Sequence, residues 1–188
     1  MLGVDEAGRG PLAGPITIGV IAAPERFIIA REFPGLADSK QLTLLARERI
    51  FRQLRSRAEA GDIRFCVRCT SATRIDAWGL SRAAAAATAR GVRFLAPEPD
   101  DVMVFLDGLL KAPREYKQQT IIGGDEVVPI IALASIAAKV VRDRLMTRLA
   151  KEFPAYGFDA HKGYGTSAHY KALKKHGPCA IHRRSFLD

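Results

Sequence analysis

The sequence predicts an α/β protein in which a mixed β-sheet is flanked by helices. Short apolar, β-branched runs such as ITIGVIAAP and VMVFL are typical of strands. Longer segments with helical patterning and capping residues lie between these runs. At 188 residues with 48% hydrophobic content, the chain is long enough for one compact domain with a core.

The first quarter of the chain predicts three strands in a meander. MLGVDEAG forms a short strand that runs into a glycine-rich loop, and ITIGVIAAP forms a second strand that ends at Pro24. The segment FIIARE, residues 27–32, is expected to form the third strand. A helix then follows DSKQLT, with Ser39 or Thr43 as its N-cap and Gly61 as its stop.

The middle of the chain predicts one more strand and one more helix. Residues 62–69 suit a strand. Ser71 or Thr73 can cap a helix over residues 74–90, where a run of alanines allows close packing.

The last half supplies the remaining elements. DVMVFLDG is a buried strand ending on Asp107, and QQTIIGGD is a short strand ending before Asp125. Pro129 suits the first turn of a helix that runs to about residue 151, and a further helix is expected near residues 166–176. We interpret residues 1–188 as one domain, of which residues from about 150 to 188 form a basic, helical C-terminal extension.

The charge is unevenly distributed. The net charge is +9, and residues 139–188 hold 11 Lys and Arg against 4 Asp and Glu, which is 11 − 4 = +7. A basic third on a nearly neutral body fits a polyanionic partner, although a solvated basic surface explains the charge equally well.

Nothing in the sequence indicates a membrane or an export signal. Acids stand at positions 5 and 6, where a signal peptide has basic residues, and the apolar run PITIGVIAAP is far too short to cross a bilayer. We therefore expect a cytoplasmic protein. Cys66 and Cys69 form a single CVRC pair inside a predicted strand, which is weak evidence for zinc, and we interpret them as ordinary thiols.

Acidic residues stand at the ends of three predicted strands: Asp5 and Glu6 on the first, Asp107 on the buried strand and Asp125 after IIGG. Carboxylates at strand ends can meet at one rim of an α/β sheet, where ligands bind. Converging carboxylates raise one another's pKa unless a cation offsets them. Oxygen ligands suit Mg²⁺ or Mn²⁺, and a pair of such ions about 3.5–4 Å apart can clamp the two reacting oxygens of a phosphodiester.

The loop GRGPLAGP allows a second interpretation. Gly8, Gly10 and Ala13 satisfy the dinucleotide-binding pattern G-x-G-x-x-A after a strand. That pattern should open a helix, but a predicted strand follows, and Pro11 lies inside the loop. The two acids before the loop would also repel a pyrophosphate, so the metal-and-phosphate interpretation is favoured.

These residues resemble the type 2 ribonuclease H family, and bacterial ribonuclease HII in particular. DEAGRGPLAGP is close to a motif of that family, and DSKQL, FLDG, GGD, SIAAKVVRD, HKGYGT and GPCAIHRRSF follow in the expected order. The resemblance spans almost the whole chain. It implies a ribonuclease H-like fold and endonucleolytic hydrolysis of the RNA strand of RNA/DNA hybrids. It also implies cutting 5′ of single ribonucleotides in duplex DNA, and so a role in removing them.

The resemblance also implies residue roles. Two divalent ions, Mg²⁺ or Mn²⁺, would be held by the four acids, and cutting would leave 3′-hydroxyl and 5′-phosphate ends. The backbone of Gly8, Arg9 and Gly10 would contact the ribose 2′-hydroxyl, and Tyr164 the sugar at the RNA-to-DNA step. Lys40 would meet a phosphate. The full expected set is Asp5, Glu6, Asp107 and Asp125 for metal and catalysis, with Gly8, Arg9, Gly10, Lys40 and Tyr164 for substrate.

Some positions depart from the family pattern or stay outside the expected set. Leu109 stands where asparagine is frequent after the DG pair. Asp143 lies four residues after Lys139 on a predicted helix and is interpreted as structural, as is His161. We expect a monomer. A nucleic-acid binder without catalysis would require a missing carboxylate, and the sequence has all four.

Overall fold

The computed structural model describes residues 1–36 and 42–187, and its centre is a five-stranded sheet in the order β3-β2-β1-β4-β5. β1, β2 and β3 pair antiparallel, whereas β4 runs parallel to β1 and β5 runs parallel to β4. The predicted mixed sheet is therefore confirmed. The strands are β1 Leu2–Ala7, β2 Ile16–Ala22, β3 Arg64–Thr70, β4 Met103–Asp107 and β5 Lys117–Ile121.

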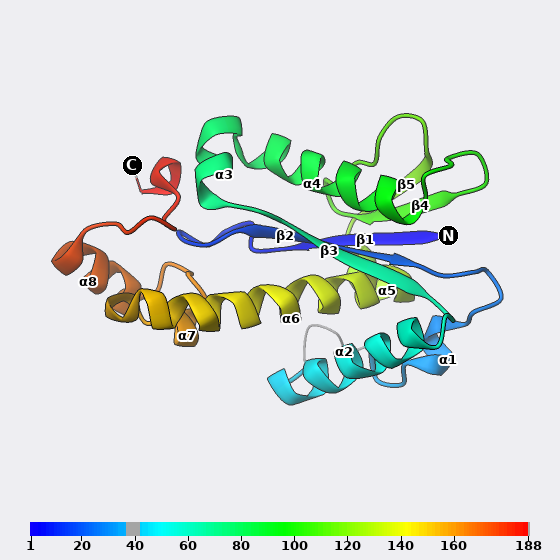
Figure 1. The fold of residues 1–188 in the computed structure, drawn as a ribbon, viewed down its shortest axis with the longest axis horizontal. Helices are drawn as coiled ribbons and strands as arrows, with labels where there is room; N and C mark the ends of the chain where they lie inside the picture. The colour runs from blue at the N-terminus through cyan, green and yellow to red at the C-terminus, as the bar shows by residue number, and fades with distance from the viewer. Residues whose placement is uncertain (37–41, 188) are drawn as a thin grey trace.

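Helices cover both faces of the sheet (Figure 1). α3 and α4 lie on one face, and the long helix α6 lies on the other with α2 and α1 beside it. The short helix α5 precedes α6, and the C-terminal helices gather at one end of α6. The bounds are α1 Ile29–Glu32, α2 Leu44–Glu59, α3 Ala72–Trp78, α4 Leu80–Leu95, α5 Gly124–Val127, α6 Pro129–Glu152, η2 Pro154–Tyr156, α7 Phe158–His161, α8 Ser167–His176 and η3 Arg184–Phe186.

The two faces of the sheet bury separate apolar clusters. The first lies between the sheet and α4, where small alanines at positions 83, 84 and 87 let the helix approach closely. The second lies between the sheet, α2 and α6. α6 is buried along most of its length, so it forms a fixed support behind β1 and β2.

Two glycines let α6 lie directly on the sheet. A Cβ added at Gly19 in β2 would lie 2.2 Å from the carbonyl oxygen of Ala134, and one added at Gly3 in β1 would lie 2.5 Å from that of Ile130. Both distances are far below ordinary contact. The close approach of α6 therefore depends on glycine at both positions.

Two predicted elements are wrong. Residues 27–32 do not form a third strand, because residues 29–32 form the helical turn α1, which buries Ile29 next to Phe33. Four-residue spacing places both side chains on one helical face. The helix predicted over residues 74–90 is two helices, α3 and α4, separated at Gly79 with φ 78°.

Other predicted boundaries are confirmed. Thr43 caps α2 by accepting a hydrogen bond from the Ala46 N–H at 3.2 Å, and Pro129 opens α6. Ser39, the alternative cap, lies outside the described residues. Among the described residues, no helix has the length and apolar character needed to span a membrane.

Candidate active site at the ends of the parallel strands

The register of β1 and β4 brings two of the predicted acids together. Val4 pairs with Leu106 in this parallel ladder, so the next residues, Asp5 and Asp107, lie side by side where the strands end. Glu6 follows Asp5 directly. β5 ends beside Asp107, and the chain then turns into α5, which carries Asp125 in its first turn.

Asp5 is the most enclosed of these acids, with 5% of its surface exposed. Burial raises its pKa to about 8, and the charges of Asp107 and Glu6 add to this effect. Hydrogen bonds from the Ser135 side chain and the Glu6 N–H oppose it. Without a nearby cation, this environment therefore favours the protonated form of Asp5.

Glu6 and Asp107 each have one carboxylate oxygen engaged. Glu6 Oε1 accepts a hydrogen bond from Arg9 Nε at 2.8 Å, and Asp107 Oδ1 accepts one from the Gly124 N–H at 2.7 Å. Glu6 Oε2 is buried and has no hydrogen-bond partner within the described part of the chain. Burying a carboxylate oxygen without a partner costs free energy, so Glu6 Oε2 indicates that a ligand binds here.

A cavity of about 340 Å³ is lined by two of these acids, Glu6 and Asp125, whereas Asp5 and Asp107 are not among its lining residues. It brings together predicted residues from separate parts of the chain, namely Glu6, Gly8, Arg9, Gly10, Asp125 and Tyr164. Asp5 is linked to this cavity through Ser135, which hydrogen-bonds Asp5 and lines the cavity. The wall is completed by Arg47 of α2 and by Ile136 and Lys139 of α6.

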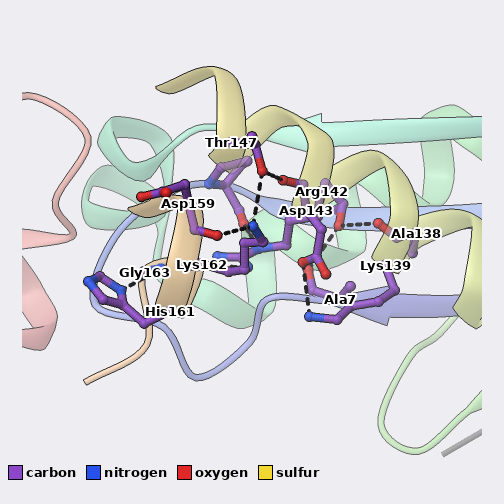
Figure 2. A network of polar contacts seen from close by, with 12 residues as sticks. Ala7, Ala138, Lys139, Arg142, Asp143, Thr147, Asp159, His161, Lys162 and Gly163 are labelled. Carbon is purple, nitrogen blue, oxygen red and sulfur yellow. Dashed lines mark hydrogen bonds and ion pairs between the residues drawn. The ribbon is translucent and has the colours of Figure 1, made fainter. Parts of the chain in front are cut away.

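Tyr164 stands beside two cations of α6. Tyr164 is 42% exposed, and the centroid of its ring lies 5.8 Å from Lys139 Nζ and 5.8 Å from Arg142 Cζ. Lys139 Nζ also bonds Asp143 Oδ1 at 2.9 Å, a contact drawn in Figure 2. The predicted i,i+4 pair of Lys139 and Asp143 is therefore present, and the structural role of Asp143 stays a prediction. A half-exposed aromatic ring beside cations suits contact with a sugar and its phosphates.

His161 belongs to the structural support of the Tyr164 loop. Its Nε2 lies 2.6 Å from the Tyr156 carbonyl oxygen, and its Nδ1 accepts from the Gly163 N–H at 3.2 Å, a bond also drawn in Figure 2. Both ring nitrogens therefore contact backbone, and the structural interpretation of His161 is supported.

Two further histidines, His169 and His182, also support this loop. The Cys179 N–H donates to His182 Nδ1 at 2.9 Å, so His182 Nε2 carries the proton and donates to His169 Nε2 at 2.9 Å. His169 Nδ1 then donates to the Tyr164 carbonyl oxygen at 2.9 Å. This chain of bonds requires both histidines to be neutral.

The loop glycines face different surroundings. Gly8 has φ +92°, and a Cβ there would lie 2.1 Å from Arg142 Nε. Gly10 lies in open space, with nothing within 4 Å of an added Cβ. The fold therefore requires glycine at position 8 and leaves position 10 unconstrained.

Sequence reasoning missed three residues that line the cavity: Arg47, Ser135 and Lys139. Ser135 and Lys139 are four apart in α6, as are Lys139 and Asp143, so helical spacing could have placed them on one face. No comparable pattern in the sequence points to Arg47. The predicted phosphate contact Lys40 lies outside the described residues.

The acids suit a divalent cation. Carboxylate oxygens are the ligands that Mg²⁺ and Mn²⁺ prefer, and both the unpartnered Glu6 Oε2 and the raised pKa of Asp5 call for positive charge. In the described part of the chain, no three His, Cys, Asp or Glu side chains are grouped as a complete metal site. Glu6 accepts a hydrogen bond from Arg9, and Asp107 accepts one from the Gly124 N–H.

A mixed sheet with acids at the adjoining ends of two parallel strands, flanked by a glycine loop, defines a ribonuclease H-like enzyme. Residues 2–188 match the family described as Ribonuclease HII, and the chain belongs to this family. Ribonuclease HII of Burkholderia thailandensis is 46% identical over 184 residues, covering 98% of this chain and 81% of that protein. The protein is accordingly a ribonuclease H, an endonuclease acting on the RNA of RNA/DNA hybrids.

Solved structures of related enzymes share the fold. Ribonuclease H2 from Pyrococcus horikoshii has a TM-score of 0.79 and 27% identity, covering 99% of this chain and 93% of that one. Ribonuclease HII from Archaeoglobus fulgidus, solved in complex with PCNA, has a TM-score of 0.78 and 25% identity, covering 97% and 93%. The predicted family and ribonuclease H-like fold are confirmed.

Proposed function

We propose that this chain cuts on the 5′ side of single ribonucleotides embedded in duplex DNA, as well as within RNA/DNA hybrids, and so serves to remove ribonucleotides from DNA. The observation that supports this proposal is the cavity, which is lined by the glycine loop, by Tyr164 and by two of the acids, Glu6 and Asp125. A 2′-hydroxyl is what distinguishes a ribonucleotide from its neighbours in DNA. Groups that can hydrogen-bond a single hydroxyl therefore support recognition of a ribonucleotide more directly than a general basic surface does.

Asp5, Glu6, Asp107 and Asp125 are the residues that would hold two divalent ions, and enzymes of this family depend on such ions. When bound, Mg²⁺ or Mn²⁺ supplies activation of the attacking water and stabilisation of the leaving 3′-oxygen, which yields 3′-hydroxyl and 5′-phosphate ends. The raised pKa of Asp5 and the unpartnered oxygen of Glu6 support this assignment.

The substrate contacts follow from the rest of the cavity. The N–H groups of the Gly8–Gly10 segment would bond the 2′-hydroxyl, while the Tyr164 ring would lie against the sugar at the RNA-to-DNA step. Arg47 and Lys139 line the same cavity and would bind phosphates flanking the cut, with Lys40 as a further phosphate contact. The whole chain would act as one catalytic domain and as a monomer, with its basic extension, from about residue 150, binding the duplex.

A panel of labelled duplexes tests this function. The substrates are a DNA duplex with one ribonucleotide, an all-DNA duplex and a long RNA/DNA hybrid, each with Mg²⁺, Mn²⁺ or EDTA. We expect metal-dependent cutting 5′ of the single ribonucleotide, with the all-DNA duplex intact. Cutting of the long hybrid alone would refute the recognition of single ribonucleotides and leave the family activity intact.

A further inference from the structure

Arg183, near the end of the chain, is fully buried behind the glycine loop. Its guanidinium donates three hydrogen bonds to loop carbonyls: Nε to Gly14 at 3.0 Å, Nη1 to Arg9 at 2.9 Å and Nη2 to Gly8 at 2.6 Å. One side chain therefore holds both ends of the loop.

Arg142, from α6, is also fully buried and holds the loop in the same way. Its Nε donates to the Pro15 carbonyl at 3.0 Å and its Nη2 to that of Ala13 at 3.2 Å. Its Nη1 reaches the Lys162 carbonyl at 3.0 Å, a bond drawn in Figure 2, and so joins the glycine loop to the Tyr164 loop.

These bonds determine where the loop N–H groups point. A trans peptide places its C=O and N–H on opposite sides, so holding the carbonyls of Gly8 and Arg9 inward turns the N–H groups of Arg9 and Gly10 outward. In the described part of the chain, these two N–H groups donate to no backbone carbonyl. Both residues line the cavity, so the free donors are available there.

We propose that Arg183 and Arg142 are positioning residues for ribonucleotide recognition. They hold the loop carbonyls so that the N–H groups of Arg9 and Gly10 meet the 2′-hydroxyl. This inference rests on the proposed function and extends it to the C-terminal segment. Arginine suits the task because its planar group offers five fixed donors, whereas lysine offers one compact ammonium.

Backbone hydrogen bonds to adjacent segments of the same chain hold Arg183 in place. Its N–H donates to the Leu12 carbonyl at 2.8 Å, and the Gly14 N–H donates to that of Ile181 at 2.9 Å. Asp76 of α3 accepts bonds from the N–H groups of Arg184 and Ser185 at 2.9 and 3.1 Å, and from Ser185 Oγ at 2.6 Å. Asp76 thus fixes the segment that carries Arg183 without touching the cavity.

The test compares Arg183→Lys, Asp76→Ala and a control, Leu95→Ala, which removes a buried side chain of the α4 cluster. Two quantities are measured for each variant: kcat/KM on the single-ribonucleotide duplex with Mg²⁺, and the ratio of dissociation constants for the all-DNA and ribonucleotide duplexes in EDTA. For Arg183→Lys we expect kcat/KM to fall roughly tenfold or more and the ratio to approach one. Asp76→Ala should shift both in the same direction by less.

Leu95→Ala should lower the melting temperature and leave the binding ratio unchanged. If Arg183→Lys lowers only the melting temperature and retains the wild-type ratio, the positioning role is overturned. If Arg183→Lys does not fold, Asp76→Ala becomes the test of the proposal. An unchanged ratio of dissociation constants in Asp76→Ala then overturns it. A wild-type protein without any preference for the ribonucleotide duplex would instead refute the proposed function.

Discussion

Gly8 and Gly10 lie in the same loop, but the fold restricts only position 8 to glycine. Gly8 has a positive φ and lies against Arg142, so the protein itself excludes a side chain there. Gly10 has neither constraint. If position 10 needs glycine, the reason is the close approach of a substrate.

Gly10→Ala is therefore expected to leave the melting temperature unchanged and to lower kcat/KM on a ribonucleotide duplex roughly tenfold or more, because its methyl group would face the cavity. Thermal unfolding and initial-rate measurements check the two parts. Gly8→Ala is the matched comparison and should lose both activity and stability, by roughly 2 kcal/mol or more. Full activity in Gly10→Ala would exclude close contact at that residue.

Single residues of the site were predictable where a motif carried them. Asp5, Glu6 and Asp107 lie on strands recognisable from the sequence, and the register of two parallel strands then joins Asp5 to Asp107. The roles of Arg142 and Arg183 were not predictable, because the glycine-loop groups that they bind are backbone carbonyls more than 120 residues away. Backbone carbonyls leave no trace in side-chain patterns.

At the scale of elements, the contact between α6 and the sheet supports the site, since α6 carries Ser135, Lys139 and Arg142. Gly19→Ala should force α6 away from β2, because the new methyl group would overlap the Ala134 carbonyl. We expect a loss of about 1–3 kcal/mol in unfolding free energy, measured by urea denaturation. Gly10→Ala serves as the control glycine variant, and equal stability of the two would contradict this account of the packing.

The C-terminal elements carry a pH dependence. Burial, with a further contribution from the adjacent His169, lowers the pKa of His182 to about 4, below the value near 6.5 expected in the unfolded chain. Between these values the unfolded state binds more protons, so stability is complete above pH 6.5 and is lost as the pH falls toward 4. Urea denaturation between pH 7 and 5 should show this loss. His182→Gln should flatten the dependence, and an unchanged slope would contradict the assignment.

The elements were predictable where local signals agreed with burial. Thr43 and Pro129 mark helix starts through side-chain and ring chemistry that acts locally. The prediction for residues 27–32 was wrong because a short apolar, β-branched segment suits a strand as well as a helix. The segment instead forms a helical turn that buries Ile29 in the cluster next to α6. Gly79 looked like an ordinary helix position, and only its positive φ separates α3 from α4.

At the scale of the whole molecule, the charge gathers toward the C-terminus. α8 ends with Lys174 and Lys175, both exposed, and the whole chain carries +9. Affinity for a duplex should therefore fall steeply with salt. Replacing both lysines with alanine should weaken all-DNA and ribonucleotide duplexes by the same factor and reduce the salt slope by up to about two. A selective loss for the ribonucleotide duplex would contradict a purely electrostatic role for α8.

The central claim is that four separate carboxylates act together as the metal-binding group. The most direct test is Mn²⁺ binding, by electron paramagnetic resonance, to the wild-type protein and to Asp5→Asn, Glu6→Gln, Asp107→Asn and Asp125→Asn. Asp143→Asn is the control, since Asp143 is an acid of α6 that pairs with Lys139. The account predicts that each of the four variants weakens binding roughly tenfold or more, while the control binds as the wild type does. Wild-type affinity in the four variants, or an equal loss in Asp143→Asn, would contradict it.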